Sequence, residues 1–234
     1  MRSFLILIYF ILFFLLTLPF LLLAYIIGVF SKKAQYKYTY YVGKGWSNIL
    51  LFLAGTKITV TGLHNIPDGP ALFVGNHRSL FDIPALYRFF PNPTGFVSKN
   101  EMSKLPIMSW WMSSIGCIFL NRDDVRAAMK TMLLGIDLLK QGQSLVIFPE
   151  GTRSKTEDML PFKQGSLKFA QKANVPIVPF GISNTDQILK KNSLNVKSAN
   201  ITLNFGEPID LNTLSKEELK KSAEYVQDIV KSLI

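Results

Sequence analysis

The sequence predicts an α/β fold: a mixed, largely buried β-sheet flanked by helices, preceded by a hydrophobic, membrane-anchoring helical hairpin. From about residue 56, short apolar runs alternate with stretches of helical periodicity, which is typical of α/β domains. Before that point, a long uncharged stretch predicts the anchor. The runs expected to form strands are 57–61, 71–75, 95–98, 115–120, 144–148, 177–182 and 201–205.

Helical patterns separate several of these runs, and another one closes the chain. The closing pattern begins at a capping box, in which Ser215 and Glu218 stand three residues apart, and it runs to about Leu233. The sequence shows no internal repeat and no low-complexity linker. The other expected helices are 83–90, 106–114, 125–141 and 165–174.

The amino-terminal stretch carries no charged residue between Arg2 and Lys32. Its apolar run, residues 4–30, exceeds the roughly 20 residues that span a bilayer and is too long for the h-region of a signal peptide. Pro19, near its middle, kinks or breaks the helix. One kinked spanning helix and a two-helix hairpin within one leaflet both remain. We favour the hairpin, because two halves of about 15 residues are each too short to cross about 30 Å.

A basic segment follows the anchor. It carries Lys32, Lys33, Lys37 and Lys44, with several tyrosines and a tryptophan between and after them that suit a membrane–water interface. Such a segment lies on the cytoplasmic side and attracts anionic head groups by about 1 kcal/mol per charge. We therefore expect a protein held at the cytoplasmic face of the cell membrane. Its parts are an anchor over 1–33, an interfacial segment over 34–56 and a globular domain over 57–234.

Composition restricts the partners. The net charge of +10 favours anionic ones. Arginines and lysines are not clustered with aromatic residues, and no helix-turn-helix, zinc or RNA-binding motif is present, so anionic lipid is favoured over nucleic acid. The single cysteine, Cys117, cannot form a disulfide within the chain or a cysteine metal cluster. Because it lies within an apolar run, it is also a poor candidate for an acyl-carrying nucleophile.

His77 and Asp82 form the first candidate constellation, where the strand 71–75 gives way to a helix. Imidazole exchanges a proton near neutral pH, and a carboxylate within reach can orient it as a general base. A spacing of five separates two side chains by about 500° around a continuous helix. They therefore meet only if His77 lies in the turn and Asp82 in the first helical turn. Ser79 is a plausible N-cap, so Asp82 could also serve only as the partner of that cap.

The motif F-P-E-G-T-R-S at 148–154 follows the strand 144–148. Ligands collect at strand ends in α/β sheets. Here Glu150, Gly151 and Arg153 combine an acid, a residue that permits close backbone approach, and a planar fork suited to phosphate. A turn that merely ends the strand, with no role in binding, would have a similar sequence.

Two further cations follow other expected strands. Arg122 comes shortly after the run 115–120, and Lys99 directly follows the run 95–98. The motif V-P-I-V-P at 175–179 opens another strand between prolines and is more suited to shaping an apolar groove than to chemistry.

These four blocks, in this order, resemble the glycerolipid acyltransferase family, in particular its 1-acylglycerol-3-phosphate (lysophosphatidic acid) acyltransferases. The resemblance covers about residues 57–210. H-x-x-x-x-D alone is a weak pattern, whereas all four blocks in order are highly specific. The family pattern implies that His77 deprotonates the acceptor hydroxyl while Asp82 holds the imidazole. It also implies that Glu150 and Gly151 position the glycerol.

The same resemblance implies that Arg153, Arg122 and Lys99 hold the phosphate. The expected reaction moves an acyl group from acyl-CoA or acyl-carrier protein to the sn-2 hydroxyl of lysophosphatidic acid, giving phosphatidic acid. Glycerol 3-phosphate, another lysolipid and CoA-independent transfer between lipids remain alternatives, as does a non-catalytic basic lipid-binding module. No G-x-S-x-G elbow, P-loop or G-x-G-x-x-G is present, and His77 and Asp82 alone offer too few metal ligands. We expect no cofactor and no metal.

Overall fold

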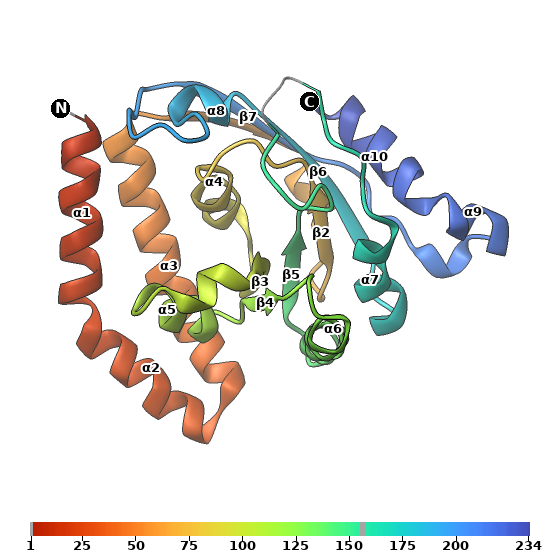
Figure 1. Ribbon diagram of the computed structural model, residues 1–234, viewed down its shortest axis with the longest axis horizontal. Coiled ribbons are helices and arrows are strands. Elements are labelled where there is room, and N and C mark those ends of the chain that lie inside the picture. The colour runs from red at the N-terminus through yellow and green to blue at the C-terminus, as the bar shows by residue number, and fades with distance from the viewer. Residues whose placement is uncertain (1, 155–157) are drawn as a thin grey trace.

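A mixed seven-stranded sheet forms the centre of the described chain. The computed structural model describes residues 2–154 and 158–234. Within them, the strand order is β1-β7-β6-β2-β5-β3-β4 (Figure 1). Neighbouring strands are parallel except for β6 and β7, which pair antiparallel. The strands are β1 (Lys57–Thr61), β2 (Leu72–Gly75), β3 (Thr94–Lys99), β4 (Ile118–Leu120), β5 (Ser144–Ile147), β6 (Ile177–Ser183) and β7 (Asn200–Phe205).

All seven expected strands are present, and the mixed sheet is confirmed. The run 115–120 forms a strand only from Ile118, because the preceding residues close the helix before it. The N–H groups of Ile115, Gly116 and Cys117 donate to carbonyls of residues 111–113, and Gly116 has a φ of 82°. Those donors are therefore not available to a sheet ladder.

Helices cover both faces of the sheet. Side chains such as Phe73 and Val146 point to a core shared with α3 and α4, whereas Leu72 and Leu145 point to a core shared with α6, α7 and α10. The helices are α1 (Arg2–Leu16), α2 (Leu18–Phe30), α3 (Lys32–Ala54), α4 (Asp82–Phe89), α5 (Met108–Ser114), α6 (Val125–Lys140), α7 (Lys168–Ala173), α8 (Thr185–Ile188), α9 (Lys216–Lys220) and α10 (Ser222–Ser232).

The amino-terminal helices form an apolar arm. Helices α1 and α2 meet at Thr17 with a bend of 48°, and Pro19 lies in the first turn of α2. The chain reverses at Ser31, not at Pro19, and α3 runs back along the other two helices (Figure 1). Pro19 therefore bends the chain without reversing it. A proline in the first turn of a helix removes no helical hydrogen bond, so α2 continues from that point. Most of the expected interfacial segment folds as α3.

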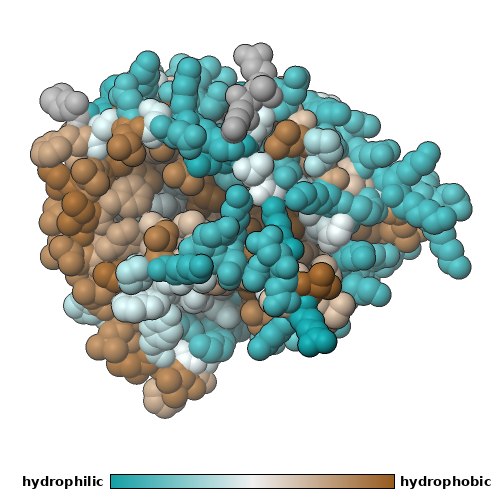
Figure 2. Space-filling view, viewed as in Figure 1, coloured by the Kyte–Doolittle hydropathy of each residue, from teal (hydrophilic) through white to brown (hydrophobic). Residues whose placement is uncertain are grey.

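Large apolar side chains of α1 and α2 face outward. Val29 and Phe30, at the end of α2, are 81% and 84% exposed. Figure 2 shows hydrophobic residues gathered on the side formed by these helices, while hydrophilic residues dominate the rest of that view. No single described helix is long and apolar enough to cross a bilayer, although the bent pair of α1 and α2 together has the length and composition.

The expected carboxyl-terminal helix is interrupted. Its capping box is present, because Ser215 and Glu218 exchange hydrogen bonds, but α9 and α10 are separate at Lys221. In a continuous helix the N–H of Ala223 would donate to the carbonyl of Leu219. The amide of Gln164 instead donates to that carbonyl at 2.6 Å and accepts from the N–H of Ala223 at 3.0 Å. Gln164 thus replaces one helical hydrogen bond with two of its own.

Candidate active site

His77 and Asp82 meet in the turn between β2 and α4. Asp82 is the first residue of α4, and its Oδ2 lies 2.7 Å from Nδ1 of His77. The Asp82 side chain is fully buried, whereas that of His77 is 17% exposed. An imidazole that donates through Nδ1 leaves Nε2 to accept a proton. The expected contact between His77 and Asp82 is therefore present.

Asp82 is also fixed by the protein around it. Its Oδ2 accepts the N–H groups of Arg78 and Ser79 at 2.8 and 2.9 Å, and its Oδ1 accepts the hydroxyl of Thr185. The expected N-cap, Ser79, is wrong: Phe81 occupies that position. The Ser79 hydroxyl instead donates to the carbonyl of Leu189. The carboxylate therefore organises the turn itself, which is more than closing the first turn of a helix.

The adjacent strand ends bring F-P-E-G-T-R-S to the same place. Because β2 and β5 are parallel neighbours, their carboxyl ends lie side by side. The ring of Phe148 stacks on the imidazole of His77 with centroids 4.1 Å apart and planes 16° apart. The N–H of Ser154 donates to the carbonyl of His77 at 3.0 Å. Phe148 thus restricts the rotation of the ring that Asp82 orients.

The side chain of Glu150 is bound to backbone. Its Oε1 accepts the N–H of His77 at 2.7 Å and its Oε2 accepts the N–H of Leu160 at 2.9 Å. Glu150 is only 4% exposed, and this burial raises the pKa of its carboxyl, while the two N–H donors act in the opposite direction. The acid therefore joins the His77 turn to the segment that follows the motif.

Gly151 and Arg122 touch each other. Gly151 has a φ of 76°, which favours glycine. Its carbonyl accepts from Nη1 of Arg122 at 2.9 Å, and a Cβ at this position would overlap that nitrogen. Arg122, exposed beyond the end of β4, is thereby held against the motif.

The other two expected phosphate ligands are less constrained. Arg153 is half-buried, and its carbonyl accepts from Nζ of Lys191 at 2.8 Å. Lys99 is exposed at the end of β3, paired with Leu120 of β4. Within the described residues, no hydrogen bond or ion pair joins either cationic side chain to His77, Asp82 or Arg122.

Several residues at the site have no signal in the sequence. Thr185, Asp186 and Lys191 follow β6 and lie more than 100 positions from His77 or about 40 from F-P-E-G-T-R-S. They reach the site because β6 is the other neighbour of β2 in the sheet. Asn76 reinforces that contact, since its side-chain amide exchanges hydrogen bonds with the backbone of Ile182, both at 2.8 Å.

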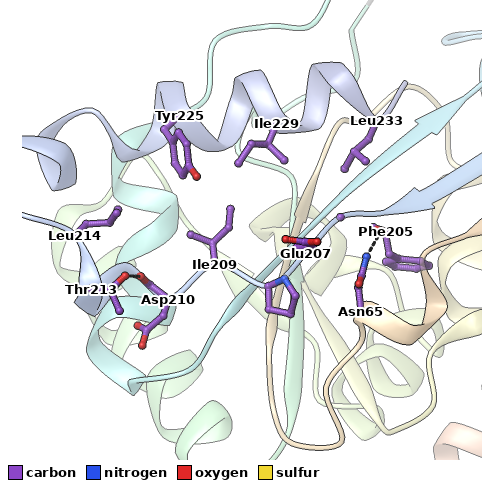
Figure 3. Close-up of a pocket in the computed structure, with 12 residues that line it drawn as sticks. Asn65, Phe205, Glu207, Ile209, Asp210, Thr213, Leu214, Tyr225, Ile229 and Leu233 are labelled. Carbon is purple, nitrogen blue, oxygen red and sulfur yellow. Dashed lines mark hydrogen bonds between the residues drawn. The ribbon is translucent and has the colours of Figure 1, made fainter.

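Three other features of the described residues bear on rival chemistries. An open cavity of about 590 Å³ lies between α10 and the segment after β7, and none of its lining residues belongs to the dyad (Figure 3). Glu207 and Asp210 line it, which suits a phosphorylated ligand poorly. Cys117 is buried, and burial raises the pKa of its thiol to about 12. Among the described residues, no cluster of three potential ligands could hold a metal ion.

Comparison with known proteins agrees with these motifs. The acyltransferase family model matches residues 57–183. The 1-acyl-sn-glycerol-3-phosphate acyltransferase of Borreliella burgdorferi is 33% identical over 79% of this chain and 75% of its own length. The enzyme of the same name from Saccharomyces cerevisiae is 32% identical over 77% of this chain and 61% of its own. This chain thus spans less than two thirds of the yeast relative.

A solved structure resembles the whole chain. The crystal structure of the 1-acyl-sn-glycerophosphate (LPA) acyltransferase from Thermotoga maritima matches with a TM-score of 0.76 and 29% identity. The match covers 100% of this chain and 98% of that one. The family model, the relatives and the shared fold agree with the order of the sequence motifs. The protein belongs to the acyltransferase family, among relatives that are named 1-acyl-sn-glycerol-3-phosphate acyltransferases.

Proposed function

We propose that this protein transfers a fatty acyl group from a thioester to the sn-2 hydroxyl of 1-acyl-sn-glycerol 3-phosphate, giving phosphatidic acid. The 2.7 Å contact between His77 and Asp82 is the observation that carries this proposal. It leaves a general base beside F-P-E-G-T-R-S and Arg122, at the sheet edge where substrates of α/β proteins bind. The names of the relatives supply the acceptor.

The reaction needs one proton relay. Nε2 of His77 takes the proton of the acceptor hydroxyl as the oxygen attacks the thioester carbonyl. Asp82 stabilises the resulting imidazolium, as the aspartate does in serine-hydrolase triads. The tetrahedral intermediate then breaks its carbon–sulfur bond, and the leaving thiolate takes the proton back from His77. The products are the ester and the free thiol, and no cofactor enters the balance.

Arg122, Arg153 and Lys99 would hold the phosphate of the acceptor. Arg122 and Arg153 lie on the segments that follow β4 and β5, and Lys99 is the last residue of β3. Glu150 and Gly151 would position the glycerol indirectly. Glu150 binds the turn of His77, and the carbonyl of Gly151 holds Arg122. The donor would be acyl-CoA or acyl-carrier protein.

Helices α1 and α2 would attach the protein to the cytoplasmic leaflet without crossing it. Their exposed apolar residues support insertion, and each helix alone is too short to span about 30 Å. Lys32, Lys33 and Lys37, all exposed just after the apolar tip of α2, would meet anionic head groups. An acceptor whose tail already lies in the leaflet would reach the site from that side.

The decisive experiment measures transfer of oleate from oleoyl-CoA to lysophosphatidate in vesicles, with acyl-carrier protein as a second donor. We expect His77→Ala to lose at least about 10²-fold of the rate, the lower range of general base catalysis. His64→Ala is the matched control, because this other histidine is exposed in a short turn after β1. A fully active His77→Ala variant would overturn the mechanism. Inactive wild-type protein with both donors would show that the acceptor is another lipid.

A further inference from the structure

We propose that Thr185 is a positioning residue for the dyad, acting through the oxygen of Asp82 that does not face His77. This inference rests on the proposed function, since it assigns a role within the same reaction. Thr185 is fully buried, and its hydroxyl donates to Oδ1 of Asp82. Oδ2 is left to His77 and to the N–H groups of the turn. The two oxygens are thus divided between two tasks.

The division matters because the carboxylate is buried and cannot replace a lost donor with solvent. Asp82 is fully buried, so each lone pair that loses its donor costs desolvation free energy that is not recovered. With Thr185 in place, the plane of the carboxylate is fixed at both ends. Without it, the carboxylate can rotate to satisfy Oδ1, and this rotation takes Oδ2 out of line with Nδ1 of His77.

Two further contacts show that the segment beginning at Thr185 is built onto the His77 turn. The guanidinium of Arg78 lies against Asp186, with Nε 3.1 Å from Oδ1 and Nη2 3.3 Å from Oδ2. The hydroxyl of Ser79 donates to the carbonyl of Leu189 at 2.9 Å. Arg78 and Ser79 are the residues whose N–H groups bind Oδ2 of Asp82. The same segment therefore holds the donors on both sides of the carboxylate.

The test compares kcat and KM of Thr185→Val, which keeps the shape and removes the hydroxyl, with those of Thr185→Ser, which keeps the donor. A hydrogen bond to a charged group corresponds to about 10- to 150-fold in rate, so we expect a loss of that size in kcat for valine. KM for both substrates should change by less than about twofold, because Thr185 is fully buried and its hydroxyl binds Asp82. Serine should restore kcat to within about threefold of wild type.

Thr39→Val is the matched control. Thr39 is also fully buried, and its hydroxyl lies 2.9 Å from the carbonyl of Ser114, away from the dyad. It should lower the unfolding temperature and leave kcat unchanged. A folded Thr185→Val with wild-type kcat, or a Thr39→Val with an equal loss, would overturn the proposal. Should the valine variant not fold, Thr185→Cys, which keeps only a weak donor, takes its place with the same two outcomes.

A second readout separates this proposal from the proposed function. The Nδ1 proton of a histidine bound to a carboxylate gives a far-downfield NMR signal, which needs no substrate. We expect this signal in wild type and Thr39→Val, and its loss or upfield shift in Thr185→Val. An unchanged signal in Thr185→Val would overturn the positioning role. Absence of acyl transfer by wild-type protein would contradict the proposed function alone.

Discussion

The acids and the cations at the carboxyl end of the sheet are held in opposite ways. Asp82 and Glu150 are buried, and both oxygens of each carboxylate accept hydrogen bonds from the protein. Arg122 and Lys99 are exposed at the ends of β4 and β3. The difference shows which side chains must be held in one precise position. A proton transfer depends on direction, whereas attraction of a phosphate tolerates movement of long cationic side chains.

Replacing Asp82 should produce the largest effect. Asp82→Asn removes the negative charge that stabilises the imidazolium of His77, and in one of its two orientations it places an NH₂ group against Nδ1–H of His77. We expect kcat to fall by about 10³- to 10⁴-fold, as in triads whose aspartate becomes asparagine. Steady-state kinetics with both substrates measure it. A loss confined to KM would show that Asp82 acts in binding.

Replacing Glu150 should disturb stability and activity together. Glu150→Gln places a donor against the N–H of either His77 or Leu160, at a cost of about 1–3 kcal/mol in the free energy of unfolding. Glu218→Gln is the control, because Glu218 is exposed and its carboxylate accepts the N–H of Ser215, a contact that a glutamine oxygen can replace. Chemical denaturation of each variant measures the change. Equal effects of the two substitutions would contradict the role assigned to Glu150.

The pH dependence of the same two variants should differ in sign. Burial raises the pKa of Glu150 in the folded state, so its contribution to stability is present at low pH and is lost as pH rises through that value. The hydrogen bond from Ser215 lowers the pKa of Glu218, so its contribution is present at higher pH and is lost as pH falls. The difference between wild type and each glutamine variant, measured from pH 3 to pH 8, should therefore follow opposite trends. Parallel trends would contradict the assignment.

Replacing Gly151 should produce the smallest effect on activity, and that effect should appear in KM. In Gly151→Ala, the methyl group displaces the Arg122 guanidinium and the backbone remains in a left-handed conformation that costs about 1 kcal/mol. Gly142→Ala is the control, because Gly142 has a φ of 92° and open space around it. Both variants should lose stability, but only Gly151→Ala should raise KM for the phosphorylated acceptor. An equal KM in the two variants would show that Arg122 does not bind the phosphate.

The sequence predicts the strands well because each is a short apolar run between turn residues, a local property. It does not reveal why Cys117 is excluded from β4 or why α9 and α10 separate, because hydrogen bonds to helix α5 and to the amide of Gln164 decide these boundaries. The pairing of His77 with Asp82 could be predicted from the order of the four motifs, whereas the spacing alone left it open. The contribution of Thr185 could not, because it depends on which strand lies next to β2.

The Gln164 amide also bears on how much of the chain makes a cooperative folding unit. Gln164 and Gln227 tie α9 and α10 to the segment 160–164, and Leu160 in that segment donates to Glu150. The turn of His77 is thus supported, through Glu150, by helices that lie beyond the 57–183 match to the family model. A fragment that ends at residue 183 would retain all four sequence motifs. It would lose α9 and α10, which support the segment 160–164 that binds Glu150. The match to the family model and the set of helices that supports the site therefore end at different residues in this protein.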